Sequence, residues 1–213
     1  MIRKLFSYLW PLSKGYASEH SRRLEVNWIN GKKVLDSPNA NYSYGKLQEV
    51  LNFGLDFLEP ERARSILILG LGAGSILESL SQRGVKAKIK AVEIDPAVIA
   101  IARSEFGLDR FVLDLEEGDA AVVLANERKN YDLIIVDLFI DDQVPVKFRQ
   151  VHFWELLCNR LTADGQLLFN LGMWEKVWAR EQELKQVFEH YGGLKVKVLH
   201  RVMGQNQLLI AKR

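Results

Sequence analysis

Residues 65–95 read SILILGLGAGSILESLSQRGVKAKIKAVEID, and this stretch decides the fold. Its apolar run, 66–69, is typical of a parallel strand that is buried on both faces. The glycines that follow, Gly70, Gly72 and Gly74, let the backbone turn sharply and leave room for a ligand, because glycine has no Cβ. The stretch therefore predicts a strand, a glycine turn and a helix whose first N–H groups are available to a ligand.

A second strand, expected at 88–94, brings Glu93 to a place about 20 residues after the glycine turn. A carboxylate there reaches ribose hydroxyls, so the stretch predicts half of a nucleotide-binding site and a ribose-bearing cofactor. Taken alone, the glycines could also serve only the close packing of a strand against a helix. A dinucleotide is disfavoured because Ser75 and Ile76 stand where a third Rossmann glycine would be, and no Gly-Lys-Ser/Thr follows for a triphosphate.

The composition indicates one ordinary α/β domain with at most a small appendage, because 213 residues are too few for two large domains. The net charge of +2 and the scattered basic residues give no reason to expect nucleic acid as a partner. The single cysteine, Cys158, lies in an apolar helical stretch and is interpreted as a buried structural thiol, which fits a reducing, cytoplasmic setting. No metal site is expected, since the four histidines lack metal-type spacing.

The N-terminal residues 1–18, MIRKLFSYLWPLSKGYAS, combine basic residues with a short apolar patch. Ser7, Tyr8 and Pro11 interrupt the patch and no Ala-x-Ala site follows, which argues against a signal peptide. No run approaches the ~18 apolar residues of a membrane span. We therefore expect no membrane partner, and an amphipathic arm that packs on the domain or on a second subunit.

Residues 24–36 alternate apolar and polar side chains around Asn30-Gly31. This pair tolerates positive φ and predicts a β-hairpin with a two-residue type I′ turn. Further along, the spacing of leucines predicts an amphipathic helix over 46–58.

From residue 65 onward, strand and helix patterns alternate, as in folds with a parallel sheet. The expected strands are 65–70, 88–94, 111–115, 132–139, 166–171, 194–202 and 207–212. The expected helices are 74–83, 96–105, 119–127, 147–161 and 175–190. The short turn 203–206 permits only an antiparallel pairing of the last two strands. The expected fold class is α/β, with a Rossmann-like sheet of seven strands of which the last is antiparallel.

Two units are expected along the chain. Residues 1–60 form an N-terminal arm, hairpin and lead-in helix, and residues 61–213 form the Rossmann-like catalytic domain. In such sheets ligands bind beyond the carboxyl ends of the strands, which places the glycine turn and Glu93 in one crevice with Asp119 and Asp137.

Acidic residues follow two further strands. Asp119 stands at a helix start, where it serves as an N-cap, as the acceptor of a hydrogen bond from an exocyclic amine such as that of adenine, or as both. Asp137 closes an apolar strand, and we favour a general base or cation anchor over a purely structural role. Asp141 and Asp142 form an acidic cluster that either attracts an amine or is simply a solvated loop.

Four motifs resemble, in order and spacing, those of the spermidine synthase family of class I AdoMet-dependent transferases. They are ILILGLGAGS (66–75), AVEIDPAVIAIA (91–102), EEGDA (116–120) and YDLIIVDLF (131–139). The resemblance covers nearly the whole chain, including the hairpin region. It implies an AdoMet-dependent methyltransferase or aminopropyltransferase that acts on a small acceptor, and it suggests a homodimer.

The resemblance also implies a role for each matching position. The three glycines would shape the loop around the amino-acid or aminopropyl tail of the cofactor, Glu93 would bind the ribose, and Asp119 would bind the adenine amine. Asp137 would be the base that deprotonates an attacking amine, because an ammonium has no lone pair. Tyr44 matches a tyrosine of the family's catalytic pocket.

Four positions depart from the polyamine-making members, one of them the gatekeeping Gln of the hairpin region, which appears as Arg23 or Leu24. Ala73 stands where their glycine turn has the Asp that anchors the amine of decarboxylated AdoMet, and Ile140 stands where a second Asp holds the acceptor. Gly45 replaces a Gln or His. Since a dication needs several carboxylates to offset its desolvation, these losses favour S-adenosylmethionine as cofactor and methyl transfer to an unknown small acceptor.

Two alternatives stay open. The first is aminopropyl transfer from decarboxylated S-adenosylmethionine to a diamine, as in polyamine biosynthesis, with Asp141 or Asp142 substituting for the missing acid. The second is a catalytically silent module that retains only the nucleoside pocket.

Overall fold

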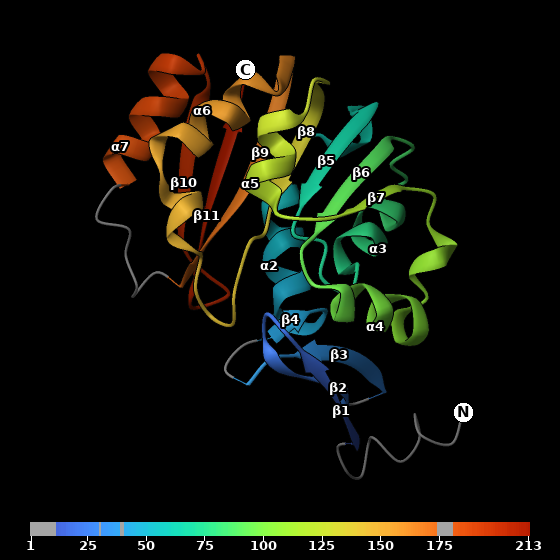
Figure 1. Cartoon of the computed structure of the whole chain (residues 1–213). Coiled ribbons are helices and arrows are strands. Elements are labelled where there is room, and N and C mark those ends of the chain that lie inside the picture. The colour runs from blue at the N-terminus through green and yellow to red at the C-terminus, as the bar shows by residue number, and fades with distance from the viewer. Residues whose placement is uncertain (1–11, 30, 39–40, 174–180) are drawn as a thin grey trace.

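The computed structural model describes residues 12–29, 31–38, 41–173 and 181–213. It contains a seven-stranded sheet flanked by helices and, beside it, a four-stranded sheet formed by the N-terminal residues (Figure 1). No helix in these described ranges is long and apolar enough to cross a membrane.

The large sheet has the strand order β10-β11-β9-β8-β5-β6-β7. Its strands are β5 (Ser65–Leu69), β6 (Lys88–Glu93), β7 (Asp114–Glu117), β8 (Tyr131–Val136), β9 (Leu161–Met173), β10 (Lys195–Val202) and β11 (Asn206–Lys212). All neighbours pair in parallel except that β11 runs antiparallel to both β9 and β10. The prediction of seven strands with the last one reversed is therefore confirmed.

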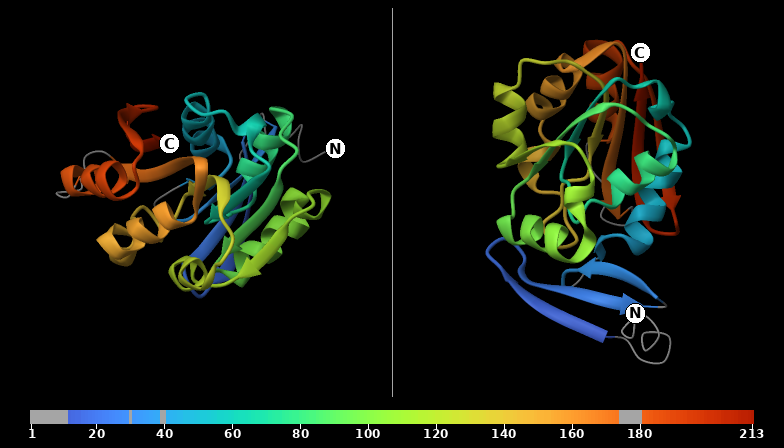
Figure 2. Two further views of the ribbon diagram at one scale, coloured as in Figure 1. Left: turned by 90° about the horizontal axis from the view of Figure 1, so that it is seen from above. Right: turned by 90° about the vertical axis from the view of Figure 1, so that its right-hand side faces the viewer.

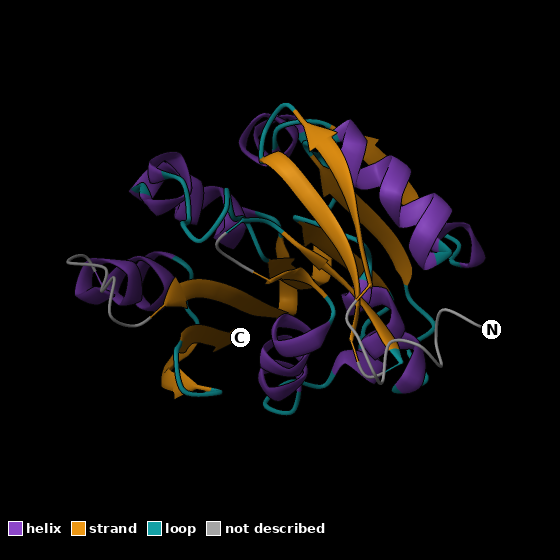
Figure 3. Cartoon of the chain, turned by 90° about the horizontal axis from the view of Figure 1, so that it is seen from below, coloured by secondary structure: helices purple, strands orange, loops and turns teal. Residues whose placement is uncertain are grey.

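Helices cover both faces of this sheet (Figure 3). They are α2 (Gly45–Leu55), α3 (Ser75–Gln82), α4 (Pro96–Phe106), α5 (Ala120–Asn126), α6 (Val151–Asn159) and α7 (Glu181–Gln186), the last continued by a π-helical turn, Val187–Tyr191. Short 3₁₀ segments occur at Pro60–Arg62, Leu108–Arg110 and Val146–Arg149. Apolar residues of α2, α3 and α4 share one core cluster, and those of α5, α6 and α7 share the other.

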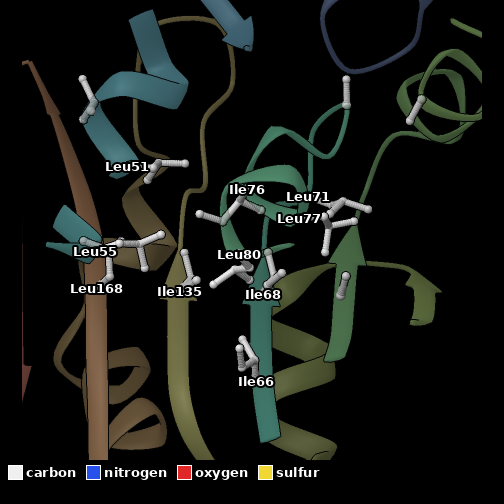
Figure 4. Close-up of a cluster of buried hydrophobic side chains, with 14 of the residues drawn as sticks. Leu51, Leu55, Ile66, Ile68, Leu71, Ile76, Leu77, Leu80, Ile135 and Leu168 are labelled. Atoms are coloured by element: carbon white, nitrogen blue, oxygen red, sulfur yellow. The ribbon is translucent and has the colours of Figure 1, made fainter. Parts of the chain in front are cut away.

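Strand β5 is a continuous apolar run because both of its faces are buried. Its side chains alternate between the faces, so that Ile66 and Ile68 join the first cluster while Leu67 and Leu69 join the second. All four are buried. Figure 4 shows Ile66 and Ile68 beside Leu80 and the other labelled leucines and isoleucines of the first cluster. Because burial of one such side chain contributes about 1.5–3 kcal/mol, this strand anchors both layers.

The small sheet is antiparallel, with the order β1-β2-β3-β4. Its strands are β1 (Leu12–Ser18), β2 (Arg22–Ile29), β3 (Lys32–Asp36) and β4 (Asn41–Ser43). The expected hairpin is present as β2 and β3. Ile29 pairs with Lys32, as a two-residue turn requires, and Gly31 has a φ of 74°, whereas Asn30 lies outside the described residues.

The N-terminal segment differs in part from the expected amphipathic arm. Residues 12–18 form a strand that pairs with β2 over its whole length, with Tyr16 opposite Leu24. Pairing supplies partners for the backbone N–H and C=O groups that a loose arm would leave to water. Residues 1–11, the apolar part of the expected arm, lie outside the described residues.

The small sheet lies across the edge of the large sheet at which the parallel strands end (Figure 2, right). Glu105 of α4 joins the two sheets, because its carboxylate accepts hydrogen bonds from Lys14 and Tyr16 of β1 and from Lys33 of β3. Ser18, at the end of β1, donates to Asp95, the N-cap of α4. The N-terminal residues thus form one wall of the crevice at this edge.

Candidate functional site

A cavity of about 230 Å³ opens where the carboxyl ends of the central strands face the small sheet. Its walls come from the glycine turn after β5, the ends of β6, β8 and β9, the loop after β8, the turn between β10 and β11, and the junction of β4 with α2. Parallel strands place such cavities at this edge, as expected from the sequence.

The glycine turn is shaped by close backbone approaches. Gly70, Gly72 and Gly74 have φ values of 87°, 57° and 88°, all in the left-handed region that favours glycine. A Cβ on Gly70 would lie 2.1 Å from the carbonyl oxygen of Asp137, and one on Gly72 would lie 3.2 Å from that of Tyr42. Gly70 and Gly72 line the cavity, whereas Gly74 is the N-cap of α3.

Glu93 ends β6 and lines the cavity although only 4% of it is exposed. Its Oε2 accepts the N–H of Gly72 at 2.8 Å, and its Oε1 accepts the N–H of Asp95 at 3.1 Å. Burial raises the pKa of Glu93, and these N–H donors oppose the rise. Each carboxylate oxygen can accept a further hydrogen bond, so Glu93 both holds the turn and is able to bind a hydroxyl.

Asp119 is the N-cap of α5, and its Oδ1 accepts the N–H of Ala121 at 2.9 Å. Its Oδ2 forms an ion pair with Lys147. Burial alone would raise the pKa of Asp119, but the Lys147 ammonium and the N–H donors outweigh it and lower the pKa. The N-cap interpretation is confirmed. Gly118 and Ala120 line the cavity on either side of Asp119, so the residue lies at its rim, and binding of the adenine amine stays a prediction.

Asp137 directly follows β8 and is half-buried in the cavity wall. Its N–H donates to Leu69 of β5 at 2.8 Å, and its Oδ1 accepts from the side chain of Asn170 at 2.9 Å. Burial raises the pKa of this carboxyl to about 7, the charge of Glu93 adds to the rise, and the Asn170 bond opposes it. Asp137 is therefore poised to take up and release a proton near neutral pH.

Asn170 was missed in the sequence, although it carries the same signal as Asp137, a polar residue at the end of an apolar strand. It is fully buried, and its Oδ1 accepts the N–H of Gly172 at 3.2 Å and the side chain of Asn206 at 3.3 Å. These two donors orient the amide so that its NH₂ group faces Asp137. Through its bonds to Asp137 and Asn206, Asn170 therefore links β8, β9 and β11 at the cavity.

Asp141 and Asp142 line the same cavity from the loop after β8. Asp141 has a φ of 55°, and its Oδ1 accepts the hydroxyl of Ser37 at 2.7 Å. The loop is thus tied to the small sheet at one of its acidic residues. Together with Asp137, the two residues give this part of the cavity an acidic character.

Three predicted site residues are absent from the cavity lining, Gly74 and Asp119, which cap helices beside it, and Tyr44. The ring of Tyr44 stacks on Phe106 with centroids 4.9 Å apart, and burial followed by the charge of Glu78 raises its pKa to about 12. Tyr42 lines the cavity instead, where burial and the charge of Glu93 raise the pKa of its phenol. The sequence offers two tyrosines two residues apart and no signal that distinguishes them.

The cavity residues fit a nucleoside. The two glycines of its wall leave the backbone open to close approach, Glu93 can accept hydroxyls, and apolar side chains such as Val92 and Phe148 offer surfaces for a base. Within the described ranges, no group of three or more His, Cys, Asp or Glu residues could hold a metal ion.

Residues 48–199 match the family described as spermine/spermidine synthase domain. Similar curated proteins include the polyamine aminopropyltransferase of Neisseria meningitidis serogroup A, 33% identical over 57% of this chain and 47% of that protein. They also include the eEF1A lysine and N-terminal methyltransferase of Bos taurus, 32% identical over 52% of this chain and 18% of that protein. The chain spans less than half the length of these relatives.

The similar solved structures also include a spermidine synthase and a methyltransferase-like protein. A spermidine synthase in complex with the transition state analogue AdoDATO has a TM-score of 0.69 at 17% identity. The match covers 93% of this chain and 72% of that chain. Human methyltransferase-like protein 13 in complex with SAH has a TM-score of 0.57 at 25% identity, over 78% of this chain and 82% of its own. The first likeness shows the fold.

Proposed function

Because the chain belongs to the spermine/spermidine synthase family of AdoMet-dependent transferases, we propose that it methylates a small amine, with Asp137 as the base. The family includes both aminopropyltransferases and methyltransferases. The choice between the two reactions rests on the cavity.

The observation that carries this proposal is the pairing of Asp137 with Asn170 at the cavity wall. An amine acceptor is an ammonium ion at neutral pH and must lose a proton before its nitrogen can attack the carbon next to a sulfonium. A carboxylate whose pKa lies at about 7 can accept that proton, and it is positioned by a buried amide. The proton would pass from the acceptor nitrogen to the Asp137 side chain.

Glu93 and the glycine turn would hold the donor. The remaining acceptor sites of Glu93 suit the ribose hydroxyls, and Gly70 and Gly72 permit a close approach of the nucleoside to the backbone. Bound AdoMet supplies a methyl group made electrophilic by the sulfonium.

Ala73 supports methyl transfer over aminopropyl transfer. It is 1% exposed and belongs to the apolar cluster with Ile76 and Leu77, so the turn presents no carboxylate for the free amine of decarboxylated AdoMet. Decarboxylated AdoMet would lack this anchor, whereas AdoMet carries its own carboxylate next to its amine.

Aminopropyl transfer to a diamine is the second candidate, and the acidic loop favours it. Asp141 and Asp142 line the cavity together with Asp137, and a diamine carries two positive charges that such carboxylates would bind. In that reaction Asp141 would bind the distal ammonium while Asp137 deprotonates the attacking one.

Mass spectrometry of the nucleoside product tests both candidates. The purified chain is incubated with AdoMet or its decarboxylated form and with putrescine, shorter amines or a lysine-containing peptide. S-adenosylhomocysteine indicates methyl transfer, and methylthioadenosine formed from the decarboxylated donor indicates aminopropyl transfer. If neither product forms although a donor binds, the silent nucleoside-binding module is the correct interpretation.

A further inference from the structure

Lys46 is a cavity residue to which the proposed reaction assigns no role. It is the second residue of α2, it is exposed, and it lines the cavity beside Tyr42 and Leu47. The same cavity is lined by Gly72 and Glu93. A lysine therefore stands at the border of the space in which the donor would lie.

Two contacts hold the start of α2 against the glycine turn. Ser43, at the end of β4, donates its hydroxyl hydrogen bond to the hydroxyl of Ser75 at 3.2 Å. Gln48 of α2 donates to the carbonyl oxygen of Ser75 at 3.3 Å. Ser75 is the first residue of α3 and directly follows the turn. Lys46 lies between these two contacts in sequence, so its backbone is fixed close to the turn.

In the described part of the chain, neither an ion pair nor the helix dipole gives Lys46 a stabilising role in the fold. The other lysine of the cavity, Lys147, is paired with Asp119, but no acidic group of the described residues forms an ion pair with Lys46. A positive charge in the first turn of a helix is also unfavourable, because the helix dipole is positive at that end. The charge is thus available for an anion in the cavity.

We propose that Lys46 binds the carboxylate of the donor's amino-acid tail and thereby selects AdoMet over its decarboxylated form. The inference rests on the proposed function, in which the tail lies at the glycine turn. AdoMet ends in a carboxylate and an ammonium, whereas decarboxylated AdoMet ends in an ammonium alone. Ala73 is buried in the glycine turn and carries no charge. Lys46, next to the turn, is therefore the side chain that would distinguish the tail of AdoMet from that of decarboxylated AdoMet.

Isothermal titration calorimetry on the full chain tests this selectivity without requiring turnover. AdoMet and decarboxylated AdoMet are titrated into the wild type, Lys46→Met and Lys46→Glu. Lys86→Met removes an exposed lysine away from the cavity and serves as the matched control. We expect Lys46→Met to weaken AdoMet binding by about three- to tenfold, as for a partly exposed ion pair, and to leave the decarboxylated form unchanged. Lys46→Glu should reverse the preference, and Lys86→Met should change neither Kd.

The outcomes separate this inference from the function on which it rests. If the wild type binds AdoMet and Lys46→Met binds it equally well, the role of Lys46 is wrong while the proposed transferase stands. An equal loss for both ligands would mean that Lys46 supports the fold of the cavity, which also overturns its selective role. Failure of the wild type to bind either ligand would overturn both proposals.

Discussion

Asp137 is a carboxyl group whose surroundings set its proton affinity close to neutrality. Burial comes first among the causes, the charge of Glu93 adds to it, and the hydrogen bond from Asn170 opposes it. A base is most effective when its pKa lies near the working pH, because it is then both ionised and able to hold a proton. The value of about 7 fits that requirement.

We expect Asp137→Asn to lower kcat/KM by about 10²- to 10⁴-fold, the usual contribution of a general base. In the wild type, kcat/KM should rise with pH through about 7, because only the ionised carboxylate accepts the proton. The measurement is a pH profile with the amine that gives product, with exposed Asp164→Asn as the control. A profile that is flat through neutrality would remove Asp137 from the role of base.

Glu93 should contribute to donor affinity through its charge. We expect Glu93→Gln to weaken AdoMet binding by about 1.5–3 kcal/mol, the contribution of a hydrogen bond to a charged group. The amide keeps one acceptor oxygen, so the loss reflects the charge more than the shape. Calorimetry measures the change, with Glu61→Gln as a control at an exposed position. An unchanged Kd would show that Glu93 serves only to hold Gly72.

Polar residues at strand ends were the part of the site that the sequence could indicate. Asp137 was found because it closes an apolar strand, and the same rule applied to the next strand would have found Asn170. The choice between Tyr42 and Tyr44 could not be made this way. Tyr44 has a φ of 66°, which turns its ring away from the cavity and onto Phe106, and a sequence pattern does not reveal such a backbone reversal.

Among the elements, the glycine turn has the least freedom to change. Gly70→Ala should destabilise the protein by more than about 3 kcal/mol, since a left-handed alanine costs roughly 1–2 kcal/mol and its Cβ would also collide with backbone. The collision is with the carbonyl oxygen of Asp137, 2.1 Å from the added atom.

Gly84→Ala separates these two effects. Gly84 has a φ of 73° and no atom within 4 Å of the added Cβ, so only the conformational cost of about 1–2 kcal/mol is expected. Urea denaturation of both variants measures the difference. Equal losses at the two positions would mean that the turn yields easily and is not held by β8.

Strands β5 and β8 were predictable because they contain continuous apolar runs, whereas β7 begins three residues later than the expected 111–115. The small sheet was predictable only in part. The β2–β3 hairpin has a turn signal and alternating side chains, whereas LSKGYAS of β1 has little β-propensity of its own. Its strand conformation comes from pairing with β2 and from contacts with α4. Such tertiary contacts are not encoded in a local pattern.

At the scale of the whole molecule, Glu105 is a residue that joins the two sheets, beside the Ser18–Asp95 contact. Hydrogen bonds from Lys14, then Lys33 and then Tyr16 lower its pKa to about 2. Since this value is depressed below that of the unfolded chain, the ionised group stabilises the fold above about pH 4.3. That contribution is lost as the pH falls toward 2.

Glu105→Gln should therefore destabilise the protein at pH 7 by about 1–2 kcal/mol and by much less at pH 2.5. The expected loss of stability is small because the side chain of Lys14 is largely exposed to solvent, which weakens its ion pair with Glu105. Urea denaturation at both pH values measures the difference, and Glu19→Gln, at an exposed glutamate in the turn between β1 and β2, is the control. A loss of the same size at both pH values would mean that shape rather than charge joins the sheets.

The parallel direction of the central strands followed from the alternation of strands and helices, and the reversed last strand followed from the short turn before it. The position of the small sheet did not follow, because it depends on Glu105 and Asp95, two acids of α4 and its cap that bind residues far away in sequence. Asp95 carries a helix N-cap signal before Pro96, but no sequence pattern indicates that either acid binds the small sheet.

Strand β11 follows β10 in sequence but lies between β9 and β10 in the sheet. A ribosome releases the chain from its N-terminus, so β10 has no neighbour in the sheet until β11 has been synthesised. Asn206, the first residue of β11, is also one of the two donors that orient Asn170 toward Asp137. The glycine turn and Glu93 are therefore synthesised well before Asn206, the last of the contacts that position Asn170 beside Asp137.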